Sequence, residues 1–213
     1  MEKQARRRKM DIPEQNGMTV EGKSSDNGIQ NIIMLYLHDL VGLLSGILLV
    51  LLLLFRVVIV SGPSMNNTLI DGDYLILLSN VFYTAPEKGD VIVASKDSFK
   101  DGEPIIKRVI ATEGQKVDID FDEGIVYVDD VPLDEPYTLT KTNMEEGVSF
   151  PITVEEGCIF VMGDNRNMSK DSRNPEIGLI DCREVLGKAI LLMFPGDDGG
   201  EVQRDFSRIG VVS

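Results

Sequence analysis

The sequence predicts a mostly β protein, in which a mixed or barrel-like β domain follows one N-terminal transmembrane helix. Two observations predict it. Residues 32–60 are mostly apolar, and the densest part at 41–55 with its flanks gives about 20 residues, enough to span a bilayer. From Ser61 onward the chain changes to short runs rich in Val and Ile, separated by Gly and Asp turns, which is typical of closely spaced strands.

The chain is expected to divide into a flexible cytoplasmic tail at 1–30, a transmembrane anchor at 31–60 and an extracytoplasmic β domain at 61–213. The tail is polar, and its Arg6-Arg7-Arg8-Lys9 cluster is the positive charge expected on the cytoplasmic side of a membrane helix. The alternative is a cleaved secretory signal peptide. Because the apolar run is longer than an h-region of roughly 7–15 residues and no small-x-small site precedes a polar start, we expect an uncleaved anchor.

Glycine and aspartate turns mark the strands of the β domain. Asp71-Gly72-Asp73 and Lys88-Gly89-Asp90 each precede an apolar run, and Asp122-Glu123-Gly124 joins two others. The expected strands are 74–78, 91–94, 105–111, 117–121, 125–128, 158–162, a part of 185–194, and 206–212. Residues 134–150 are expected to form an exposed loop or edge with little regular structure.

Ser64 lies in a turn directly after the apolar segment, because Gly62 and Pro63 break the helix there. A serine hydroxyl is a weak nucleophile until a base takes its proton. The single histidine, His38, precedes the apolar core whereas Ser64 follows it, so the two are expected near opposite bilayer faces, roughly 30 Å apart. This separation excludes a Ser-His-Asp triad.

Lysine can replace histidine as the base if its pKa falls, and Lys107 is the best candidate. On a strand at 105–111 Lys107 shares one face with Ile105 and Val109, so it is the charged residue in an apolar row. Moving a lysine pKa from about 10.4 to near 8 costs roughly 3 kcal/mol, which burial can supply. The alternative is a surface lysine that snorkels past its apolar neighbours.

Three separated segments add to this reading. They are the turn at 61–69 with Ser64-Met65, the pair Lys107-Arg108 with Gly114 soon after, and the run Gly163-Asp164-Asn165-Arg166-Asn167-Met168-Ser169-Lys170-Asp171-Ser172-Arg173. In this order, behind one membrane helix, they resemble the conserved boxes of the type I signal peptidases, a family of membrane-bound Ser/Lys proteases. The resemblance covers roughly residues 40–213.

The resemblance implies that Ser64 is the nucleophile and Lys107 the general base, and that Ser169 hydrogen-bonds and orients the lysine amine. It also implies an ion-paired framework made of Asp171, Arg173, Asp164 and Arg108. No cofactor or metal is expected. The implied activity is an endopeptidase on the outer face of the cytoplasmic membrane that removes signal peptides from exported preproteins with small residues at the first and third positions before the cut.

The sequence departs from the family pattern at several positions. Proline usually stands where this chain has Asn67, and the lysine box differs at Ala111 and at Glu113-Gly114-Gln115. Gly62 stands where some members have a hydroxyl that stabilises the oxyanion, so the Ser64 backbone N–H is expected to carry more of that task, alone or with a water. The departures at Asn67, Ala111 and Glu113 are the only support for an alternative, a non-catalytic membrane-tethered scaffold of the same fold.

The charge of the chain excludes one class of partner. Of the 21 basic and 35 acidic residues, 7 and 6 lie in 1–60, which leaves 14 and 29 in 61–213, a net of −15. A domain this acidic repels phosphate backbones, so no nucleic acid is expected as a partner, and the DNA-binding module of a self-cleaving Ser/Lys repressor is not seen. Cys158 and Cys182 lack metal-site spacing, and a disulfide and two free thiols both remain open.

Overall fold

The computed structural model describes residues 23–99, 102–197 and 204–212. They form two units that divide between Ile47 and Leu48. The first 22 residues of the expected tail at 1–30, with its basic cluster, lie outside the described residues.

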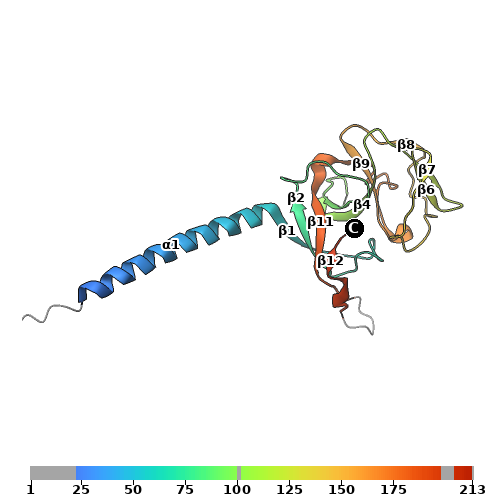
Figure 1. The fold of residues 1–213 in the computed structure, drawn as a ribbon. Coiled ribbons are helices and arrows are strands. Elements are labelled where there is room, and N and C mark those ends of the chain that lie inside the picture. Colours follow the sequence, from blue (N-terminus) through green and yellow to red (C-terminus); the bar gives the residue numbers. More distant parts are fainter. Residues whose placement is uncertain (1–22, 100–101, 198–203, 213) are drawn as a thin grey trace, which may run out of the picture. The chain divides into compact units, whose positions relative to one another are not determined.

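A long apolar helix, α1 (Lys23–Leu54), forms the amino-terminal part of the described chain (Figure 1). Its segment Gly28–Leu54 is 27 residues long with a mean hydropathy of 2.4, which is long and apolar enough to cross a membrane. Residues 28–53 are all exposed. A helix this long with so much exposed apolar surface is consistent with a membrane span.

The helix ends earlier than the sequence predicts. We expected the anchor to run over 31–60, but Phe55–Ile59 form a strand, β1, that pairs with β2 (Tyr74–Ser79) along its whole length. The apolar run continues without a break through this point, so composition alone does not mark the change. Pairing of the β1 backbone with β2 decides it.

The β domain contains two sheets (Figure 1). The larger has the order β1-β2-β11-β3-β4-β9-β10 with β12 on β11, and the smaller has the order β7-β6-β5-β8. The remaining strands are β3 (Val91–Ala94), β4 (Ile105–Thr112), β5 (Lys116–Asp120), β6 (Ile125–Val128), β7 (Val131–Pro132), β8 (Ile152–Thr153), β9 (Cys158–Met162), β10 (Ile180–Asp181), β11 (Val185–Phe194) and β12 (Gly210–Val211). Three short 3₁₀ turns, η2 (Arg166–Met168), η3 (Cys182–Glu184) and η4 (Phe206–Arg208), complete the regular structure in the described ranges.

The predicted mostly β class, behind one amino-terminal helix, is confirmed. All strand pairs that the described residues form are antiparallel, which favours the barrel-like arrangement over a mixed sheet. Three clusters of buried Val, Ile, Leu, Met and Phe side chains form the core, one of them against the smaller sheet. The loop at 134–150 contains no helix or strand, as expected.

Strand β4 lies in the middle of the larger sheet and brings distant segments together. Arg108 of β4 is opposite Val91 of β3 on one side and Met162 of β9 on the other. The pairing with β9 begins only at Arg108, so Ile105–Lys107 have no strand partner on that side within the described chain. The charged run at 163–173 follows directly from β9 and therefore lies beside this open end of β4.

Candidate active site

The turn that carries Ser64 is fixed at both ends. Val60 donates its backbone N–H to Asp73 at 2.8 Å, and Gly62 donates to Asp71 Oδ1 at 2.7 Å. Gly62 has φ +86°, a conformation that favours glycine, and Pro63 follows it, so the strand ends here. Met65 and Leu69 are buried in the core beyond the turn. Ser64 lies between these fixed points and stays half-exposed.

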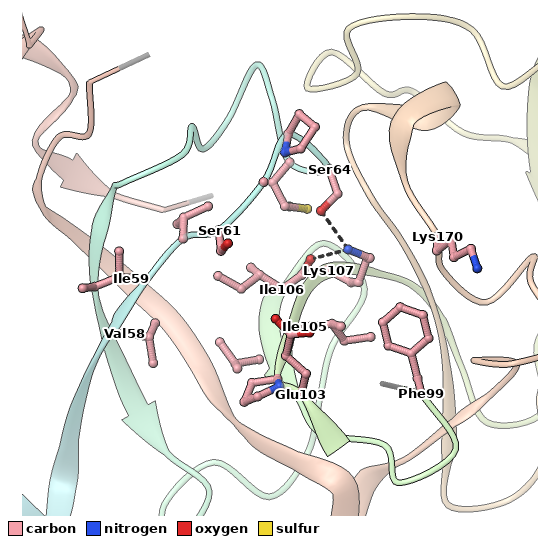
Figure 2. A pocket seen from close by; sticks show the side chains of 16 residues that line it. Val58, Ile59, Ser61, Ser64, Phe99, Glu103, Ile105, Ile106, Lys107 and Lys170 are labelled. Atoms are coloured by element: carbon pink, nitrogen blue, oxygen red, sulfur yellow. Dashed lines mark hydrogen bonds between the residues drawn. The ribbon is translucent and has the colours of Figure 1, made fainter. Parts of the chain in front are cut away.

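Lys107 reaches this serine from β4. Its Nζ lies 2.8 Å from Ser64 Oγ and donates to the Ile106 carbonyl at 2.9 Å (Figure 2). The lysine is 4% exposed, so the surface alternative considered above does not occur. Burial lowers the pKa of Lys107 from 10.5 to about 8, against an opposing effect of the carboxylates Asp171, Glu146 and Asp164. An amine with this pKa is uncharged in a useful fraction near neutral pH and can accept a proton.

Asp171 organises the loop after β9. Its Oδ2 accepts hydrogen bonds from the Gly163 backbone N–H at 3.0 Å, from Ser169 Oγ at 2.8 Å and from Arg173 Nη2 at 2.8 Å. Arg173 Nε donates to Asp171 Oδ1, also at 2.8 Å, and both side chains are buried. Asp171 and Arg173 therefore form the paired framework that the sequence predicts.

Ser169 differs from its prediction. We expected its hydroxyl to hydrogen-bond to the Lys107 amine, but it donates to Asp171, and in the described chain no hydrogen bond joins it to Lys107. An ionised carboxylate is a stronger acceptor than a neutral amine, so the single hydroxyl proton goes there. Ser169 is buried beside the site and orients Asp171 in this structure.

The second predicted pair, Arg108 with Asp164, joins β4 to the end of β9. Arg108 Nε and Nη2 donate to the two Asp164 oxygens at 2.8 and 2.7 Å, and both residues are buried. The Arg108 guanidinium lies 4.1 Å from the centre of the Tyr137 ring. Thr68 of the serine turn donates its hydroxyl to Asp164 at 2.5 Å, which couples the pair to the nucleophile segment.

The loop after β9 also holds the Ser64 backbone directly. The Asn165 backbone N–H donates to the Ser64 carbonyl at 3.0 Å, and Asn165 Nδ2 donates to the Pro63 carbonyl at 3.1 Å. A Cβ at Gly163 would lie 2.3 Å from Ser169 Oγ and 2.5 Å from the Ser64 carbonyl oxygen, so only glycine allows this close approach.

Sequence reasoning missed several supporting residues. Arg166, buried, is paired with Glu135, and Thr68, Tyr137 and Glu146 also take part in the charge network. Arg166 lies within the charged run and could have been found there. Glu135, Tyr137 and Glu146 lie in the irregular loop at 134–150, where no periodic pattern distinguishes an inward from an outward side chain.

A groove of about 670 Å³ opens beside Ser64 and Lys107. The serine turn and β1 line one side, and β4 with Phe99 lines the other (Figure 2). Most of the lining side chains are apolar, including Val58 and Ile105, with Glu103 and Lys170 as charged exceptions. Because the open end of β4 borders this groove, an extended peptide could lie along it and pair with the strand backbone. In the described part of the chain, no three His, Cys, Asp or Glu side chains gather as metal ligands would.

Both cysteines are free thiols of intermediate exposure in this structure, and burial raises the pKa of each. A raised pKa leaves less reactive thiolate.

Known proteins resemble this chain over most of its length. The family model described as signal peptidase, peptidase S26, matches residues 33–194. Signal peptidase I of Bacillus licheniformis is 35% identical over 156 residues, which are 70% of this chain and 81% of that protein. Signal peptidase I T of Bacillus subtilis strain 168 is 35% identical over 162 residues, again 70% of this chain and 81% of that protein.

A solved structure also matches. It is a signal peptidase I from Enterococcus faecalis V583, with a TM-score of 0.40 and 29% identity, and the match covers 49% of this chain and 96% of that one.

Proposed function

This chain belongs to the signal peptidase family, peptidase S26, and we propose that it is a membrane-bound endopeptidase that removes signal peptides with Ser64 and Lys107 as its dyad. The family membership supports a protease that acts on exported preproteins. The single observation that carries the dyad is the 2.8 Å contact between Ser64 Oγ and a buried Lys107 amine.

The proposed reaction begins when the neutral Lys107 amine takes the proton of Ser64 and the serine oxygen attacks the scissile carbonyl. The oxyanion that forms is stabilised by the Ser64 backbone N–H, which has no hydrogen-bond acceptor elsewhere in the described residues, while Gly62 offers no hydroxyl. The Lys107 ammonium then protonates the leaving amine. Water activated by the same amine hydrolyses the acyl-enzyme and restores Ser64.

The substrate is proposed to bind as an extended segment in the groove along the open end of β4. Apolar side chains on both walls suit a chain without charge next to the cut. Glu103 and Lys170 lie on the lining farther from the dyad and would meet polar parts of a longer segment (Figure 2).

The helix at 28–54 is proposed as a single-pass anchor, with the tail in the cytoplasm and the β domain outside the cell membrane. Its length, its hydropathy of 2.4 and its exposed apolar surface support this. Since a preprotein is itself held in the membrane by its signal peptide, an anchored protease meets the cleavage site close to the lipid.

The test is cleavage of a fluorogenic signal-peptide substrate by the full chain in detergent. Ser64→Ala and Lys107→Met should each lower kcat/KM by at least about a hundredfold, because each removes a group that acts at the reacting atoms. Lys116→Met, which changes a half-exposed lysine whose amine forms a salt bridge with the exposed Asp130, is the matched control and should keep the rate. Equal rates in all four proteins would contradict the Ser64–Lys107 dyad and would favour the non-catalytic scaffold.

A further inference from the structure

Glu146 is a buried carboxylate that the proposed chemistry does not use. Its side chain is 7% exposed, and neither oxygen meets the distance and angle limits of a hydrogen bond within the described residues, although the Asn174 side chain and the Asp171 backbone N–H act on it weakly. Its nearest charge is Arg173, whose Nη2 lies 3.2 Å from Oε1. Burying an ionised carboxylate with so few hydrogen bonds costs free energy, so this environment favours the protonated form of Glu146.

Arg173 connects Glu146 to the loop that supports the dyad. Its guanidinium donates to both Asp171 oxygens and to the backbone carbonyls of Met144 and Arg166, and its Nη2, which donates to Asp171, also contacts Glu146. Asp171 already neutralises this arginine through two bonds of 2.8 Å. Glu146 is therefore a second, surplus carboxylate on the same guanidinium.

The balance of buried charges around the dyad relates Glu146 to Lys107. The three buried arginines each have a carboxylate, in the pairs Arg108–Asp164, Arg166–Glu135 and Arg173–Asp171. Among the described residues of this cluster, the remaining acid is Glu146 and the remaining base is Lys107, while the buried Asp73 and Asp90 pair elsewhere, with Arg208 and Lys188. The cluster is therefore neutral overall when these two groups share one proton, whichever of them holds it.

The groups that act on each member can be named. Asp171 and Arg173 act on the Glu146 carboxyl, together with the Asn174 side chain, and burial, followed by Asp171, raises its pKa to about 7. Asp171, Glu146, Asp164 and Arg173 act on Lys107, and ionised Glu146 opposes the effect of burial by favouring the ammonium form. Two groups with neighbouring pKa values of about 7 and 8 and a mutual charge effect titrate as a coupled pair.

We propose that Glu146 is a positioning residue for the proton of the dyad: when ionised it holds the proton on Lys107, and when neutral it leaves the Lys107 amine free to act as base. This inference deepens the proposed Ser/Lys function and rests on it for its catalytic consequence. The charge relation between the two residues rests on the burial of both side chains and on the pairing of the other charges in the cluster.

The experiment compares the wild-type chain with Glu146→Gln, which keeps the shape and removes the charge. Loss of the negative charge should lower the pKa of Lys107 by about 0.5 to 1 unit. The rising limb of the kcat/KM profile should move to lower pH by the same amount, giving roughly threefold to tenfold more activity at pH 6.5 with an unchanged plateau. Glu145→Gln, which alters the exposed neighbour, should leave both quantities unchanged.

A direct readout separates this inference from the proposed function. The full chain carrying lysine labelled with ¹³C at Cε is titrated by NMR in detergent, and the Lys107 signal is assigned by its loss in Lys107→Met. A lower Lys107 pKa in Glu146→Gln supports the inference even in a chain that cleaves no substrate. An unchanged Lys107 pKa overturns it, even when wild type cleaves the substrate normally. A rate that falls equally at every pH without a shifted limb also overturns it, because that is the result of a purely structural role.

Discussion

At the scale of one residue, the burial of Lys107 serves the proposed chemistry but lowers the stability of the fold. Burial lowers the pKa of Lys107 from 10.5 to about 8, so the unfolded chain binds this proton more tightly than the folded one. Lys107 therefore costs no folding stability above its unfolded pKa of 10.5. The cost grows as the pH falls from 10.5 and reaches its full size below about 8. At pH 7 the buried lysine costs about 3 kcal/mol of stability.

Lys107→Met should therefore unfold at higher denaturant concentration than wild type at pH 7, by up to about 3 kcal/mol in the free energy of unfolding. Methionine fills a similar volume and carries no charge to desolvate. The advantage should shrink toward pH 10.5, where the unfolded lysine also loses its proton. Chemical unfolding of the full chain in detergent at pH 7 and pH 10 measures it, and an advantage that is equal at both pH values would contradict the linkage.

Asn67 shows what a single departure from a family pattern does to the backbone. It has φ +92°, and its Nδ2 donates to the Tyr137 carbonyl at 3.2 Å. Proline, which the family usually has here, is restricted to φ near −65° and has no such donor. Proline could not take this φ, so the turn after Ser64 as it stands here requires a residue other than proline at position 67.

At the scale of the elements, the pair Arg108–Asp164 connects three of them. It joins β4 to the end of β9, and Thr68 ties the serine turn to the same carboxylate. The network thus holds Ser64 and Lys107 in register although they are 43 residues apart in the sequence.

Asp164→Asn should cost about 3–5 kcal/mol of stability, because it leaves the buried Arg108 guanidinium without its carboxylate. Activity should fall further than stability explains, since the serine turn loses its tie through Thr68. The control is Asp130→Asn, which breaks an exposed pair with Lys116 at a position whose φ of +65° asparagine tolerates well. Thermal unfolding and kcat/KM below the transition measure both effects, and similar Tm losses in the two variants would refute the role of the buried pair.

The elements also show how far the sequence determines the fold. The predicted strands at 91–94, 125–128 and 158–162 match β3, β6 and β9, because glycine and aspartate turns bound each apolar run. Strand β1 was not predictable, since its residues continue the apolar pattern of the helix and only pairing with β2 separates them.

Some features of the candidate site could be predicted from the sequence and others could not. A turn and an apolar strand made Ser64 and Lys107 candidates, but only the resemblance of three separated segments to a known family selected them as a pair. The hydrogen bond of Ser169 was assigned to the wrong partner, since competition between Asp171 and the amine for one proton is decided by distances in three dimensions. Glu146 gave no signal, because an irregular loop does not reveal which side chains point inward.

At the scale of the whole molecule, apolar and charged surface are separated along the chain. Residues 28–54 expose apolar side chains all around one helix, whereas 61–213 carry the net charge of −15 derived above from the 35 acidic and 21 basic residues. The first part has the length and hydropathy of a membrane span, and the second has the charge of a surface solvated by water. This separation fits a protein with one end in the membrane and the other in solution.

We propose that the basic cluster at 6–9 sets the direction of that arrangement, because positive charge beside a membrane helix favours the cytoplasmic side. In cells stripped of their wall, added protease should therefore remove a tag fused after Ser213 and leave a tag fused before Met1 intact until the membrane is permeabilised. Replacing Arg6, Arg7, Arg8 and Lys9 with serine should increase the fraction of inverted chains, because the bias that retains the tail is gone. A protected tag after Ser213 in the unchanged chain would place the β domain in the cytoplasm, where the groove beside Ser64 could not meet a translocated signal peptide.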